Sequence, residues 1–195
     1  MINIRLFFIF LFVTPFLSHA GIITLPSDQE VNVEVYGKDN AKHHILWMHS
    51  EYGINSELQH VILNTTKKQD IQVFLPDWLD SYYIHPSRSS LEKIPQDDFE
   101  DLIHHYTQKT QGKSQKLIIV AESRAASLAL NAAHHLQSKG HNLIAGIILV
   151  SPYLQKQTPK IGTAIEYQTI TSYINCLKSL FILKSSPEHI LYQGV

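Results

Sequence analysis

A serine stands between an apolar run and an alanine-rich run in the middle of the chain. Residues 116–130 read KLIIVAESRAASLAL, in which residues 117–120 are typical of a buried strand and residues 125–136 of a helix. Ser123 therefore falls at the turn between a strand and a helix. A hydroxyl held in such a turn can attack a carbonyl carbon once a base removes its proton. Serine is also a favoured helix N-cap residue, which is the structural alternative.

This strand–turn–helix segment resembles the nucleophile elbow of the α/β-hydrolase-fold superfamily, which contains serine esterases and lipases and usually reads G-x-S-x-G. Ala121 and Ala125 stand at the two glycine positions. Those positions press against the neighbouring strand and helix, so only small side chains fit there. The resemblance implies that Ser123 is the nucleophile and that the backbone N–H of Arg124 stabilises the oxyanion.

A second loop matches the part of the family that supplies the other oxyanion donor. Residues 47–53 read WMHSEYG and are similar to the family's H-G-x-x-G-like turn, with Ser50 at a position where glycine is common. The resemblance implies that the backbone N–H of Glu51 is the second donor, with Ser50 as the next candidate. His49 is expected close to Ser123, in the pocket, where it could serve as a base by a rearranged route.

The remaining members of a catalytic triad are sought after the seventh strand, which residues 180–183 match. The next segment, KSSPEH, holds one carboxylate, so the resemblance implies Glu188 as the acid and His189 as the candidate base. The family normally continues with an eighth strand and a loop that carries the catalytic histidine, whereas this chain stops a few residues past the seventh strand. Three interpretations follow: a truncated enzyme, an enzyme with a non-standard base, or a non-catalytic binding or scaffolding module.

An aromatic and polar segment, residues 78–95, follows the strand expected at residues 71–75. Ligands of open α/β sheets bind beyond the carboxyl ends of the strands. Trp78, Tyr82 and Arg88 are therefore predicted to line a pocket or form a lid. The alternative is an aromatic loop that packs on the domain and covers its core.

The remaining pattern alternates strands and helices after an opening hairpin. The predicted strands are residues 21–25, 31–36, 44–48, 71–75, 117–120, 143–150 and 180–183. A helix with a Ser56-x-x-Gln59 capping box is expected next to the third strand, and a second helix buries Phe99, Leu102, Ile103 and Tyr106. Gly140 is expected to cap the helix after Ser123, and residues 151–177 are ambiguous, with room for one irregular helix.

This order predicts an α/β fold. Strands that read as continuous apolar runs and alternate with helices indicate a mostly parallel sheet with helices on both faces, and the hairpin adds an antiparallel start. The arrangement is three-layered and α/β-hydrolase-like. We expect a single domain over residues 21–195.

Residues 1–20 are interpreted as a cleavable signal peptide. Arg5 provides a positive start, residues 6–17 are apolar, and Ser18 and Ala20 are small residues before the expected cleavage site. The apolar run is shorter than the roughly 20 residues that span a bilayer comfortably. We therefore expect an exported protein, periplasmic or secreted, without a stable membrane span after cleavage. An uncleaved membrane anchor is the alternative.

Composition excludes several classes of partner. The formal net charge is −1 and no basic stripe is present, which argues against binding of nucleic acid. Cys176 is the single cysteine, so no internal disulfide can form, and we expect a buried thiol. The histidines do not follow metal-binding spacings, and neither a metal nor another cofactor is implied. The expected partner is a small-molecule or lipid-like ester, and the oligomeric state is left open.

Overall fold

The structure is a computed structural model of the 195-residue chain, and it describes residues 19–110, 117–141, 143–158, 166–169 and 180–183. The Glu188–His189 pair, Cys176 and residues 1–18 of the expected signal peptide lie outside these ranges.

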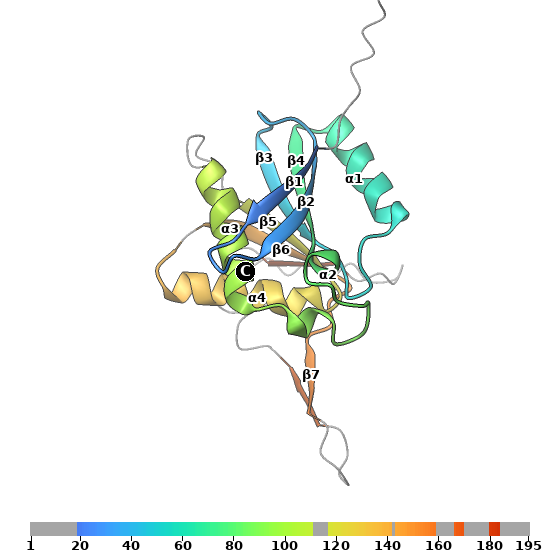
Figure 1. The fold of residues 1–195 in the computed structure, drawn as a ribbon, viewed down its shortest axis with the longest axis vertical. Helices are drawn as coiled ribbons and strands as arrows, with labels where there is room; N and C mark the ends of the chain where they lie inside the picture. Colours follow the sequence, from blue (N-terminus) through green and yellow to red (C-terminus); the bar gives the residue numbers. More distant parts are fainter. Residues whose placement is uncertain (1–18, 111–116, 142, 159–165, 170–179, 184–195) are drawn as a thin grey trace, which may run out of the picture.

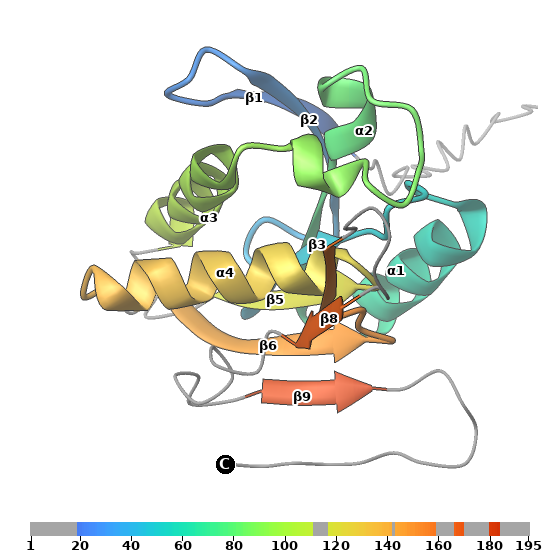
Figure 2. The same ribbon diagram turned by 90° about the horizontal axis from the view of Figure 1, so that it is seen from below.

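A seven-stranded sheet with the order β1-β2-β4-β3-β5-β6-β9 organises the fold (Figure 1). The pairs β1–β2 and β2–β4 are antiparallel, and all the other pairs are parallel. The predicted mixed sheet with an antiparallel opening hairpin is thus confirmed. Figure 2 shows β9 beside β6 at the far edge. The strands are β1 (His19–Thr24), β2 (Glu30–Tyr36), β3 (His43–Met48), β4 (Ile71–Asp77), β5 (Leu117–Glu122), β6 (Ile144–Val150) and β9 (Leu180–Leu183).

Helices cover both faces of the sheet because alternate residues of the strands point to opposite sides. On β4, Phe74 joins a large core with α3 and α4, whereas Val73 and Leu75 pack with residues of α1. Figure 1 shows α1 on one side of the strands and α3 and α4 on the other. The helices are α1 (Ser56–Lys68), α2 (Trp78–Ser81), α3 (Gln96–Thr110) and α4 (Ala125–Ser138), with a 3₁₀ turn η1 (Leu91–Lys93).

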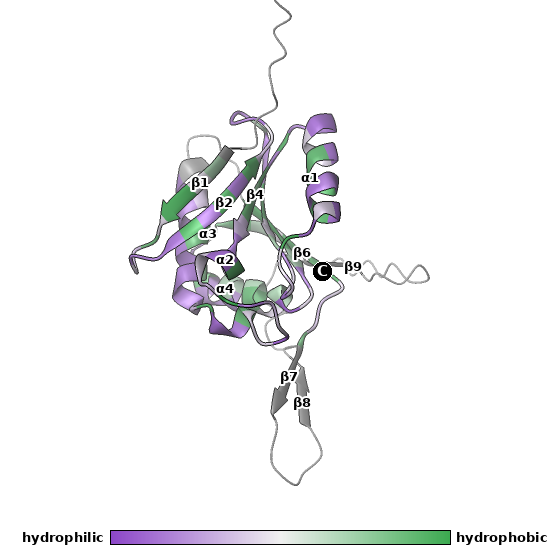
Figure 3. Cartoon of the chain, turned by 45° about the vertical axis from the view of Figure 1, so that its right-hand side comes forward, coloured by the Kyte–Doolittle hydropathy of each residue, from purple (hydrophilic) through white to green (hydrophobic). Residues whose placement is uncertain are grey.

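The amphipathic face predicted for α3 is confirmed. Its four apolar residues, Phe99, Leu102, Ile103 and Tyr106, are all at most 2% exposed. Polar residues lie on the outer surfaces, and Figure 3 shows them recurring along α1. In the described part of the chain, none of the helices is long and apolar enough to cross a membrane.

Several local predictions differ from the structure. The N-cap of α1 is Asn55, whose side chain accepts the N–H of Leu58 at 2.8 Å, so the predicted Ser56 capping box is wrong. Residues 155–158 and 166–169 form an antiparallel pair, β7 (Gln155–Thr158) and β8 (Glu166–Thr169), within the range for which the sequence indicated room for an irregular helix. The segment predicted as a loop after β4 contains α2 and η1. Short elements of this kind are fixed by tertiary contacts rather than by periodicity.

The predicted C-cap at Gly140 is confirmed, because its φ is +81° and α4 ends two residues earlier. The N–H of His141 bonds to the carbonyl of Leu136 at 2.9 Å, and that of Gly140 bonds to Gln137 at 2.9 Å. These two bonds form a Schellman motif, which satisfies carbonyls that the helix end would leave unpaired.

Gly37 is the position where an added methyl group should be most harmful. Its φ is +95°, and a Cβ there would lie 2.3 Å from the carbonyl oxygen of Ile71. Gly37→Ala is therefore expected to lower the free energy of unfolding by more than the roughly 1–2 kcal/mol of left-handed strain alone. Urea denaturation would measure it. Gly140→Ala is the matched control, since its φ is also positive but nothing lies within 4 Å of the added Cβ. Equal losses in the two variants would contradict the predicted clash.

Candidate active site

The site begins with the backbone of Ser123, which joins β5 to α4. Its φ is +48°. This left-handed conformation is energetically unfavourable for any residue other than glycine. Three hydrogen bonds hold it there. The Ser123 N–H donates to Val150 at 3.0 Å, and its carbonyl accepts the N–H of Tyr153 at 2.9 Å and that of Ala126 at 3.3 Å. The end of β6 and the loop that follows it thus hold the strained turn at Ser123.

The small residues on either side of the turn are buried as the sequence predicts. Ala121 and Ala125 are 0% and 1% exposed and belong to the large core. The predicted strand–turn–helix is confirmed. The alternative role of Ser123 as a helix N-cap is wrong, because Arg124 occupies the cap position and makes no side-chain capping bond.

The hydroxyl of Ser123 points instead to a carboxylate on another loop. Its Oγ donates to Glu51 Oε1 at 3.2 Å, and the backbone N–H of Arg124 lies 3.4 Å from Glu51 Oε2. Glu51 is 5% exposed. Its own carbonyl oxygen accepts a hydrogen bond of 2.9 Å from the buried hydroxyl of Ser90. The sequence analysis selected Glu51 for its backbone N–H, as the second oxyanion donor. It did not predict the hydrogen bonds of the Glu51 side chain.

The guanidinium of Arg124 lies between aromatic and acidic groups. It stands over the ring of Tyr153, 4.0 Å from the centroid. Its Nε is 3.8 Å from Glu51 Oε1, and its Nη1 is 3.8 Å from the largely exposed Glu92. This cation partly offsets the buried negative charge of Glu51. No pattern in the sequence marked Tyr153 or Glu92 as members of the site.

His49 lies in the same loop and is fully buried. Its Nδ1 is 2.7 Å from the carbonyl oxygen of Ser50, while its Nε2 has no partner in the part of the chain that the structure describes. Burial lowers the pKa of the His49 imidazole, which favours the neutral ring. Among the described residues, Ser123 Oγ bonds to Glu51 and to no histidine.

A second carboxylate, Glu122, directly precedes Ser123 in the chain. Glu122 accepts the indole N–H of Trp47 at 2.7 Å, and burial raises the pKa of the Glu122 carboxyl group. The hydrogen bond from Trp47 opposes this rise without cancelling it. Trp47 is packed against the core on the α1 face, so this pair ties the last residue of β5 to β3. The Trp47–Glu122 hydrogen bond therefore helps to fix the end of β5, directly before the turn at Ser123.

The three predicted pocket residues of the aromatic segment, Trp78, Tyr82 and Arg88, have different environments in the structure. Trp78 is 1% exposed and packs in the core against Phe99, with ring centroids 5.1 Å apart, so it does not form an open wall or lid. Tyr82 is half-buried and donates a hydrogen bond to Asp98. Arg88 is exposed. The alternative, aromatic packing that covers the core, therefore describes Trp78, whose ring packs against Phe99 of α3.

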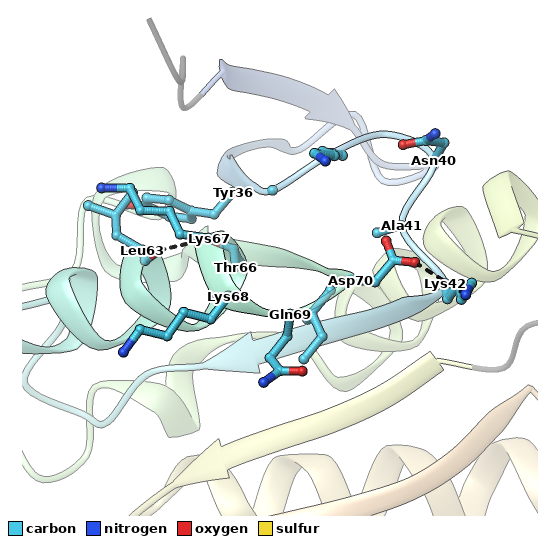
Figure 4. A pocket seen from close by; sticks show the side chains of 13 residues that line it. Tyr36, Asn40, Ala41, Lys42, Leu63, Thr66, Lys67, Lys68, Gln69 and Asp70 are labelled. Carbon is cyan, nitrogen blue, oxygen red and sulfur yellow. Dashed lines mark hydrogen bonds and ion pairs between the residues drawn. The ribbon is translucent and has the colours of Figure 1, made fainter.

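A hollow of about 770 Å³ lies near the amino ends of β3 and β4, at the opposite end of the strands from Ser123. Figure 4 shows it between the end of α1 and the starts of β3 and β4, with Lys42, Lys67 and Lys68 among its side chains. Asp70 lies 3.9 Å from Lys42 in this hollow. Ser123 follows the carboxyl end of β5, which is parallel to β3, so the hollow is remote from the elbow. It contains none of the residues predicted for the site.

The arrangement at the elbow can support acyl transfer. A serine hydroxyl and a backbone N–H converge on the same carboxylate, and they could converge in the same way on a carbonyl group. Glu188 and His189, the candidate acid and base, lie outside the described residues, so their roles stay predictions.

Comparison with solved structures identifies the fold. An esterase of the fungus Rhizomucor miehei matches with a TM-score of 0.54 at 12% identity, over 80% of this chain and 47% of the esterase. Brefeldin A esterase, described as a bacterial homologue of human hormone-sensitive lipase, matches with a TM-score of 0.53 at 14% identity, over 70% and 40% of the two chains. A hyperthermophilic esterase from the archaeon Pyrobaculum calidifontis matches with a TM-score of 0.54 at 12% identity, over 73% of this chain and 46% of the esterase.

The chain therefore has an α/β-hydrolase-like fold, and it spans less than half the length of these esterases. No protein-family profile matches the sequence. No curated protein matches it either.

Proposed function

We propose that this chain carries the nucleophile and oxyanion elements of an exported serine hydrolase that acts on small or lipid-like esters. One observation carries the proposal: the Ser123 hydroxyl and the Arg124 N–H both face the carboxylate of Glu51, 3.2 Å from Oε1 and 3.4 Å from Oε2 respectively. The φ of +48° at Ser123, a value that glycine would adopt more easily, supports a functional reason for a serine there. Export rests on the sequence of residues 1–20.

In the proposed reaction, Ser123 Oγ attacks the ester carbonyl carbon and loses its proton to a base. The new Oγ–C bond forms as the carbonyl π electrons move to oxygen, and the Arg124 N–H stabilises this oxyanion. A backbone N–H of the loop at Glu51 or Ser50 is the second donor. Collapse of the intermediate expels the alcohol, and water then hydrolyses the acyl group to release the acid. Glu188 and His189 are the proposed acid and base.

The test is labelling with an alkyl fluorophosphonate. We expect a phosphorus–Oγ bond to form at Ser123 with loss of fluoride, and peptide mass spectrometry would locate the adduct. Ser127→Ala is the matched control, because Ser127 lies on the first turn of α4 and its hydroxyl donates to the carbonyl of Tyr153 at 3.1 Å. Labelling should persist in that control and disappear in Ser123→Ala. An adduct that survives Ser123→Ala, or a folded wild-type chain that never reacts, would contradict the proposal.

A further inference from the structure

We infer that the Glu51 carboxylate is an internal occupant of the oxyanion site, which must leave before a substrate carbonyl can bind. This inference rests on the proposed function of Ser123. It assigns to Glu51 a role that neither the family resemblance nor a triad would give it, since the resemblance used its backbone N–H alone.

The geometry of the two hydrogen bonds carries the argument. Oε1 of Glu51 accepts from the hydroxyl of Ser123 at 3.2 Å, and Oε2 accepts from the backbone N–H of Arg124 at 3.4 Å. A negatively charged oxygen of a tetrahedral intermediate would bind the same backbone N–H. The carboxylate therefore stands where the substrate oxygen would stand, and it carries the same sign of charge.

Groups from two other segments of the chain hold Glu51 in this position. Glu51 is 5% exposed, and the Ser90 hydroxyl bonds to its carbonyl oxygen at 2.9 Å. Its cationic neighbour is the Arg124 guanidinium, at 3.8 Å, which also faces Glu92 and stacks on Tyr153. A charge buried to this degree is held by its hydrogen bonds and its partner rather than by water. The occupied arrangement is thus a defined state of the site.

Two consequences for catalysis follow. While Glu51 is in place, the Arg124 N–H is engaged and cannot stabilise a substrate oxyanion. A second negative charge forming within hydrogen-bond distance of the carboxylate would also be repelled, and the repulsion is strong where water is excluded. Mutation of one oxyanion-hole donor costs on the order of 10²–10³ in kcat in enzymes where it has been measured. Removing the carboxylate should recover part of such a factor.

A general-base role for Glu51 explains less of the geometry. It would account for the bond from Ser123 to Oε1, but not for the bond from Arg124 to Oε2. A base in that position would also exclude the carbonyl oxygen from the N–H that the reaction needs. The two roles predict opposite effects of the same substitutions, so they can be separated.

The experiment compares second-order rates of fluorophosphonate labelling in the wild type, Glu51→Gln and Glu51→Ala. Glutamine removes the charge and keeps the shape, whereas alanine also vacates the space; we expect labelling to accelerate roughly 10-fold or more, most in Glu51→Ala. The bond from Ser90 reaches the main chain of Glu51 and survives both changes. Glu57→Gln, an exposed carboxylate in the first turn of α1, is the charge control and should label at the wild-type rate.

Slower labelling in both Glu51 variants would indicate that Glu51 acts as a base. An unchanged rate would indicate that the carboxylate does not affect the reaction at Ser123. Either result overturns the inference. A second measurement does not depend on catalysis. Formate should bind in the space left by Glu51→Ala and shift the backbone amide resonance of Arg124, with no such shift in the wild type. Absence of the shift would also overturn the inference. A formate shift without labelling of any variant would instead reject the serine hydrolase function and keep the occupied site.

Discussion

Replacing Ser123 by glycine is expected to abolish fluorophosphonate labelling and still give a more stable chain than Ser123→Ala, by about 0.5–1 kcal/mol. Both variants lose the hydroxyl and its bond to Glu51, so their difference isolates the backbone. The φ of +48° costs alanine roughly 1–2 kcal/mol and costs glycine almost nothing. Part of this advantage is lost because glycine gains more entropy in the unfolded chain.

The order of stability is the diagnostic result, and denaturant unfolding with a common slope would measure it. In an ordinary helix, alanine is the more stable of the two residues by up to about 1 kcal/mol. Ala132 on α4 is fully buried, and Ala132→Gly serves as the helical comparison in which alanine should be preferred. If Ser123→Ala proved more stable than Ser123→Gly, the strained turn at the centre of the proposed site would be refuted.

Phe99→Ala is expected to cause the largest loss of stability, about 3–5 kcal/mol. The side chain is 0% exposed on the inner face of α3, and its ring lies 5.1 Å from that of Trp78. Truncation would leave a cavity between α3 and α2 and would remove the ring contact. Because both residues belong to the core that also contains Ala121 and Ala125, the loss would act on the support of the elbow as well.

Urea denaturation measures this effect, with Val61→Ala as the control. Val61 lies on α1 and is 49% exposed, so its truncation should change the free energy of unfolding by no more than about 0.5 kcal/mol. A loss below about 1 kcal/mol for Phe99→Ala would mean that the contact with Trp78 is not a packed core contact. That result would instead support the sequence prediction that Trp78 lines a pocket.

The proposed occupation of the oxyanion site by Glu51 connects these predictions with the proposed function. Ser123 and Glu51 are 72 residues apart, and the loop after β6 holds the Ser123 backbone from a third position in the chain. The stability of the turn at Ser123 therefore depends on backbone bonds to Val150 and Tyr153, whereas access to the Ser123 hydroxyl depends on Glu51. Substitutions at Glu51 should act on the rate of labelling, whereas Phe99→Ala should act on the stability of the fold.

The sequence by itself determined the elements that depend on local patterns. The four apolar residues of α3 recur at helical spacing, and Gly140 ends α4 because glycine adopts positive φ without cost. The run before Ser123 and the alanine-rich run after it defined the strand and helix of the elbow. The alternation of strands and helices after an opening hairpin then predicted a mostly parallel sheet with an antiparallel start, and the observed pairing of the strands agrees with it.

The tertiary structure decided which of the candidate residues meet. Nothing in the sequence near Glu51 distinguishes a solvated side chain from one that accepts a bond from Ser123, since the two residues lie 72 positions apart and follow strands that pair in the sheet. The same reason explains Trp78, which is a loop aromatic by local pattern and a core residue once Phe99 packs on it. Local periodicity reports which side of an element is buried, whereas the identity of the neighbour depends on the path of the whole chain.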